Sequence, residues 1–257
     1  MNHYLKTSKT HPSTGGGWGA TLKTIDGKLK VSIPTSLSGI TLGQMMQMQE
    51  KPDMNDLEAI SILSGVPLSE LHNVVNIDDF LIFGDVILSL SGQIGYLYHC
   101  DTIPDKVTFT INDQKVRVNV IRNLSVEPAG AFLAAREIIA DEINDYIKLH
   151  GEDNWQQYFQ PSLKACCQLL AHYFFCRVTG KKYDEYEAEE FSEEVKKLPV
   201  LEALPIAKHF FSCYPGLSTP KAGFFQQLQQ YWKKRQASRL LKSLNTSTPS
   251  IPSPAAT

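Results

Sequence analysis

Residues 161–178 read PSLKACCQLLAHYFFCRV, an apolar segment in which Lys164 and Arg177 are the only charged side chains. Its length and spacing predict a buried helix whose aromatic residues form part of a core, and Gly180 lies just past its end, where glycine favours helix termination. Further helical patterns precede and follow it. The sequence therefore predicts an α+β fold that is predominantly α-helical.

Two stretches alternate with the period of a β-strand instead. Residues 21–34 alternate around Asp26-Gly27, and residues 106–120 alternate around Asn112-Asp113, so each stretch predicts a small antiparallel hairpin. The second hairpin is expected to pair 106–111 with 115–120. Helices are predicted at 41–50, 54–64, 67–74, 78–91, 127–150, 161–178, 184–197, 200–213 and 221–244.

The order of these elements predicts four regions along the chain. Residues 1–20 hold few large apolar side chains and are expected to form a flexible arm, in which Trp18 is the residue able to dock. A region of β-hairpins and short helices covers 21–125, a C-terminal helical bundle covers 126–244, and 245–257 is expected to be a disordered tail. No long linker separates 21–125 from 126–244, so the sequence leaves open one domain or two.

Composition limits the classes of partner. The 257 residues are 42% hydrophobic and 20% charged, which is ordinary for a globular protein, and the net charge of −2 provides no general attraction for nucleic acid. Neither a secretory signal nor a stretch of about 18 apolar residues is present, so membrane spanning is not expected. Five cysteines, two of them adjacent, fit reduced, buried thiols better than a disulfide framework.

A repeated His-x-x-x-Cys spacing is the pattern that most suggests a metal site. His172 with Cys176, and His209 with Cys213, each place two potential ligands on one face of a helix. If the two helices packed face to face, these four side chains would form a tetrahedral Cys₂His₂ zinc site. The alternative is a core of two buried helices in which cysteines fill space between aromatic rings. The sequence otherwise indicates no cofactor.

No motif indicates catalysis, and no catalytic residue is predicted. The glycines at 15–19 lack the context of a nucleotide-binding loop, and His99, Cys100 and Asp101 are neighbours without an oxyanion-hole signature. The acidic stretch 184–194 is interpreted as a solvated face. These observations favour a binding or assembly factor over an enzyme.

The predicted helix 221–244 combines basic and apolar side chains and contains no acid. Basic amphipathic helices bind partner proteins, although this one would also suit the chain's own acidic stretch 184–194. The candidate partner-binding residues are Phe224, Phe225, Leu228, Tyr231, Trp232, Lys233, Lys234 and Arg235.

Two segments carry a resemblance to a known family. Residues 31–50 read VSIPTSLSGITLGQMMQMQE and residues 60–71 read ISILSGVPLSEL. An extended segment that leads into a Thr-Leu helix start, an acidic stretch and a short Ile-x-Ile-Leu-x-Gly module resembles the opening of tail or baseplate assembly chaperone-like proteins of tailed bacteriophages. The resemblance covers about residues 29–90.

This resemblance implies a non-enzymatic factor that holds aggregation-prone virion proteins during tail or baseplate assembly in the host cytoplasm. The implied partners are other phage structural proteins, and self-association is possible. A structural component of the virion, such as a connector, internal or tail protein, fits the same residues. The helices in 161–244 have no counterpart in the resemblance, and no binding residue is carried over from it.

Overall fold

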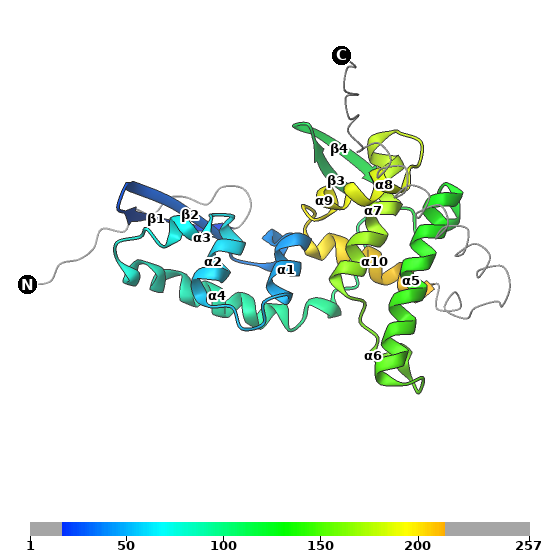
Figure 1. Cartoon of the computed structure of the whole chain (residues 1–257), viewed down its shortest axis with the longest axis horizontal. Helices are drawn as coiled ribbons and strands as arrows, with labels where there is room; N and C mark the ends of the chain where they lie inside the picture. Colours follow the sequence, from blue (N-terminus) through cyan, green and yellow to red (C-terminus); the bar gives the residue numbers. More distant parts are fainter. Residues whose placement is uncertain (1–16, 214–257) are drawn as a thin grey trace, which may run out of the picture. The chain divides into compact units, whose positions relative to one another are not determined.

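The computed structural model describes residues 17–213 of the chain (Figure 1). This part of the chain consists of two antiparallel hairpins and a larger set of helices. This confirms the predicted α+β, predominantly α-helical fold. Contacts group Met1–Ser218 into one unit and Thr219–Thr257 into a second, so every described residue belongs to the first. The predicted helix 221–244, the tail 245–257 and the arm up to residue 16 lie outside the described residues.

The first hairpin pairs β1 (Gly17–Thr24) with β2 (Gly27–Pro34) around the expected turn. Leu22 lies opposite Leu29, and the same face continues to Trp18, whose ring packs edge-on against Phe83 with 5.1 Å between centroids. The prediction that residues 17–20 belong to a flexible arm is therefore wrong. A long-range aromatic contact, which local patterning does not reveal, extends the strand.

Short helices follow the hairpin and overlap the predicted ranges 41–50, 54–64, 67–74 and 78–91, whereas the turns of 3-10 helix at Leu37–Gly39 and Leu97–His99 were not predicted. Thr41 and Gln44 form a capping box at the start of α1, and Asn55 and Glu58 form one at the start of α2, so side chains satisfy amides that the first helical turn leaves free. The elements are η1 (Leu37–Gly39), α1 (Leu42–Gln49), α2 (Asp56–Ser64), α3 (Leu68–Leu71), η2 (Ile77–Phe80), α4 (Leu81–Ile94) and η3 (Leu97–His99).

The second hairpin joins β3 (Lys106–Ile111) to β4 (Gln114–Asn119). Asn112 and Asp113 both have positive φ, 48° and 61°, as a two-residue turn between twisted strands requires. The side chain of Phe109 is buried, and its ring lies 5.2 Å from that of Phe174. The hairpin therefore covers part of the helical core.

Helix α7 lies at the centre of the helical region, beside α5 and α10 (Figure 1). The predicted helix 184–197 is divided at Phe191, whose buried ring contacts Phe109 and Phe175. The short α6 was not predicted from the sequence. The elements are η4 (Leu124–Val126), α5 (Ala129–His150), α6 (Trp155–Tyr158), α7 (Leu163–Thr179), α8 (Glu185–Glu190), α9 (Ser192–Val195) and α10 (Val200–Cys213).

Three backbone hydrogen bonds join the start of α1 to the segment between α9 and α10. The amide of Leu42 donates to Leu198 over 2.8 Å, the amide of Gly43 to Lys196 over 2.8 Å, and the amide of Val200 to Ile40 over 2.9 Å. Each bond satisfies a backbone group that would otherwise be left without a partner beside the core. The boundary predicted near residue 125 thus separates elements that contact each other directly.

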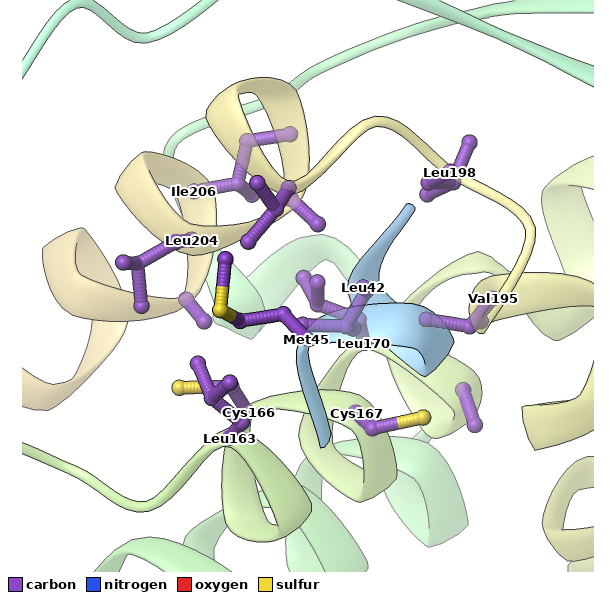
Figure 2. Close-up of a cluster of buried hydrophobic side chains, with 14 of the residues drawn as sticks. Leu42, Met45, Leu163, Cys166, Cys167, Leu170, Val195, Leu198, Leu204 and Ile206 are labelled. Carbon is purple, nitrogen blue, oxygen red and sulfur yellow. The ribbon is translucent and has the colours of Figure 1, made fainter. Parts of the chain in front are cut away.

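A buried cluster surrounds this junction. Figure 2 shows Leu42 and Met45 of α1 among apolar side chains of α7, α9, α10 and the segment between α9 and α10. The labelled neighbours are Leu163, Cys166, Cys167, Leu170, Val195, Leu198, Leu204 and Ile206, and all are buried. Burial of side chains of this size stabilises a fold by about 1.5–3 kcal/mol each. The cluster therefore ties α1 to the helical region.

We predict that Gly43→Ala destabilises the protein. A Cβ at Gly43 would lie 2.9 Å from Cβ of Lys196 and 3.1 Å from its carbonyl oxygen, so α1 must shift away from its hydrogen-bond partners. Overpacking of this kind costs about 1–3 kcal/mol, which exceeds the gain in helix propensity. Gly84→Ala in α4 is the control, because nothing lies within 4 Å of the added Cβ. Urea unfolding should show Gly43→Ala less stable and Gly84→Ala equal to or more stable than the parent chain.

Candidate protein-binding surface

The four predicted zinc ligands do not come together. Sγ of Cys213 lies 3.5 Å from Nε2 of His209, while Nδ1 of His172 lies 3.0 Å from the hydroxyl of Tyr183. Among residues 17–213, no group of three or more His, Cys, Asp and Glu side chains is arranged to hold a metal ion. The described residues therefore do not form the hypothesised Cys₂His₂ site.

The four side chains stay apart because the face of α7 that packs against α10 is not the face that carries His172. The two helices do pack, but their contact includes Tyr173 and not His172, with the ring of Tyr173 4.9 Å from that of Phe210. The neighbouring residue His172 lies about 100° further round the helix and points to Tyr183. Aromatic packing has thus taken the position between the helices that a metal ion would need.

The cysteines are free thiols, two of them fully inside the core. Cys166 and Cys167 are buried, whereas Cys213 is exposed, which corrects the expectation that the thiols are all buried. Burial raises the pKa of the Cys167 thiol to about 11 and raises that of Cys166 further. Both therefore remain protonated at neutral pH and serve as small apolar side chains.

Burial also makes His172 a source of pH-dependent stability. Desolvation lowers the pKa of this imidazole to about 4, below the value of about 6.5 expected in the unfolded chain. As the pH is lowered, His172 therefore binds a proton in the unfolded chain before it does so in the folded chain. The free energy of unfolding falls by about 3 kcal/mol between about pH 6.5 and about pH 4 because of this group.

We predict that His172→Gln reduces this loss. The free energy of unfolding, measured by urea titration at pH 7 and pH 4.5, should fall less in the variant than in the parent chain. His209→Gln is the matched control, since His209 lies at the half-buried edge of α10. An identical fall in the parent chain and His172→Gln would contradict the assignment.

The neighbouring residues His99, Cys100 and Asp101 lie in η3 and the loop after it. The carboxylate of Asp101 accepts a hydrogen bond from Lys208 over 2.6 Å, which lowers the pKa of that carboxyl group. The same lysine also donates to the carbonyl of Tyr98. Asp101 therefore helps to join η3 to α10.

Helix α4 is the feature of the described residues best suited to binding another protein. Its sequence, LIFGDVILSLSGQI, contains one charged side chain, Asp85, and apolar residues on all sides. Phe83 and Leu90 are buried against the fold, yet Leu81 and Leu88 are each 73% exposed and Ile82 is 41% exposed. Large apolar side chains grouped on the exposed side of a helix are a common feature of binding surfaces, so the exposed side of α4 is a candidate for one.

The exposed residues form a continuous face. Leu81 and Leu88 are seven positions apart, which is two helical turns, and Asp85 lies between them on the same side. Gly84 and Gly92 belong to the same face, and a Cβ added to either would have no neighbouring atom within 4 Å. We call the residues Leu81, Gly84, Asp85, Leu88 and Gly92 the α4 face.

The partner-binding residues predicted from the sequence lie outside the described residues. These are Phe224, Phe225, Leu228, Tyr231, Trp232, Lys233, Lys234 and Arg235. The α4 face was missed by the sequence analysis, which assigned 78–91 as an ordinary helix. The missed signal is the placement of Leu81 and Leu88 on the same side of the helix as Asp85, since the exposed side of an amphipathic surface helix is normally polar.

Comparison of the chain with protein-family models, with curated proteins and with solved structures found no match. Within residues 17–213, no helix is both long and apolar enough to cross a membrane.

Proposed function

We propose that the chain is a non-enzymatic factor that binds other proteins and assists the assembly of a phage tail or baseplate. The exposed apolar α4 face carries this proposal. Two leucines on one helical face, both mostly exposed, offer a partner the burial of apolar area that drives most protein association. A factor that holds aggregation-prone subunits needs such a surface.

The segments that resemble phage assembly chaperones form the support of this surface. Residues 31–50 form the end of β2, η1 and α1, and residues 60–71 form the end of α2 and α3. The side-chain carbonyl of Gln93 in α4 accepts a hydrogen bond from the amide of Leu37 in η1 over 3.2 Å. The resemblance thus supports the phage context, with other virion proteins as partners in the host cytoplasm.

A structural component of the virion is the alternative, because a permanent partner would cover the α4 face equally well. The two functions differ in whether the chain is part of the mature virion. An assembly factor is expected to be absent from purified virions, whereas a structural component is present at fixed stoichiometry. Quantitative mass spectrometry of purified particles separates the two.

The proposal is tested by co-expression with the tail-tube, tape-measure and baseplate proteins of the same phage genome. We predict that at least one of them becomes soluble only in the presence of the chain, and that Leu81→Gln/Leu88→Gln reduces its soluble fraction several-fold. Leu149→Gln is the matched control, because Leu149 is 81% exposed on α5. Circular dichroism should show that all variants fold, since the replaced side chains are on the surface.

A result in which no phage protein gains solubility, or in which Leu149→Gln has the same effect as the α4 variant, would count against the proposed function.

A further inference from the structure

We infer that the partner of the α4 face is a basic amphipathic helix of another protein. This inference rests on the proposed function and specifies the class of partner. Its basis is the distribution of charge. Between Lys51 and Lys106 the chain contains no lysine or arginine. The same stretch contains nine acidic residues: Asp53, Asp56, Glu58, Glu70, Asp78, Asp79, Asp85, Asp101 and Asp105.

The carboxylates nearest α4 lack a cationic partner in the described part of the molecule. Asp78 and Asp85 are exposed, and Asp79 is partly exposed. No lysine or arginine among residues 17–213 lies within 4.0 Å of any of the three. Asp85 lies on the α4 face itself. A partner that covers this face must therefore bring positive charge, since an uncompensated carboxylate is costly to remove from water.

The other acidic region of the described residues differs in this respect. In the stretch 184–194, lysines within the fold pair with Glu187, Glu193 and Glu194 over 2.5–2.6 Å. Its negative charge is thus partly neutralised, and it lacks a pair of exposed leucines. The combination of exposed apolar residues with unpaired carboxylates occurs at α4, which makes α4 the better match to a basic amphipathic helix.

The shape of the α4 face also suits a helix. Leu81 and Leu88 repeat at the spacing with which two helices interdigitate their side chains. Gly84 and Gly92 beside them leave room for close approach of a second backbone, because neither has an atom within 4 Å of a Cβ position. A partner helix with apolar residues every three or four positions and lysine or arginine beside them would bury both leucines and pair with Asp78 and Asp85.

The experiment uses two synthetic peptides as probes and the full chain as the receptor. The first peptide has the sequence of residues 221–244, which contains six basic residues, no acid and eight large apolar residues. The second replaces all six basic residues with glutamate. Binding is measured by fluorescence anisotropy of labelled peptide at 50 mM and 300 mM salt.

We predict that the basic peptide binds and the acidic one does not, and that higher salt weakens binding. Asp78→Asn/Asp85→Asn should weaken binding by about tenfold, as loss of two exposed ion pairs allows. Leu81→Gln/Leu88→Gln should remove it. Glu189→Gln/Glu190→Gln in α8 is the matched control and should leave binding unchanged.

Several outcomes would overturn the inference. One is equal binding of both peptides, and another is equal loss in the α8 control. If the basic peptide binds only to a full chain whose own 221–244 segment carries the six glutamates, that segment is the occupant in place of a partner. If light scattering shows a dimer that Leu81→Gln/Leu88→Gln dissociates, the occupant is a second copy.

These outcomes are separable from failure of the proposed function. Solubilisation of a phage protein that depends on Leu81 and Leu88, but not on Asp78, Asp85 or salt, would leave the proposed function standing and reject the basic helix. Peptide binding without any solubilised phage protein would support the basic helix as the ligand of the α4 face and reject the proposed function.

Discussion

The backbone hydrogen bonds between the start of α1 and the segment 196–200 connect parts of the chain that are far apart in sequence. From this junction the positions of the other N-terminal elements follow. The side-chain amide of Gln44 in α1 donates to the carbonyls of Ile62 and Leu63 at the end of α2, over 3.0 Å and 3.1 Å. The bond from Leu37 to Gln93 then fixes α4. The position of the α4 face thus depends on the junction between α1 and residues 196–200, although no residue of the α4 face takes part in that junction.

Helices α4 and α7 are both rich in apolar residues, and their environments differ. Helix α7 is enclosed by α5, α8, α9, α10 and the second hairpin, so its aromatic side chains are used for packing. Helix α4 has comparable composition, but Leu81 and Leu88 have no such cover among the described residues. The same kind of sequence therefore serves as a core in one place and as an exposed surface in the other. Tertiary context, which composition does not determine, makes the difference.

Local chemistry explains which features could be predicted from the sequence. The turn at Asn112-Asp113 and the helix end at Gly180 each depend on residues close together in the chain, and the structure has both. The extension of β1 to Gly17 and the face of α7 that meets α10 depend on distant rings, such as Phe83 and Phe210. The zinc hypothesis failed for this reason, since helical spacing places two ligands on one face without saying what that face contacts.

The charge of the α4 face bears on the proposed function, in which an exposed apolar helix stays free before it meets a partner. Asp85 lies between Leu81 and Leu88, so two copies packed through this face would bring carboxylates together without a cation from the described residues to compensate them. Repulsion of this kind disfavours pairing of identical chains, yet the same carboxylate favours a cationic partner. Asp85, the one acidic residue of the α4 face, therefore has two effects. In the proposed function it would oppose aggregation of the free protein and select a cationic partner.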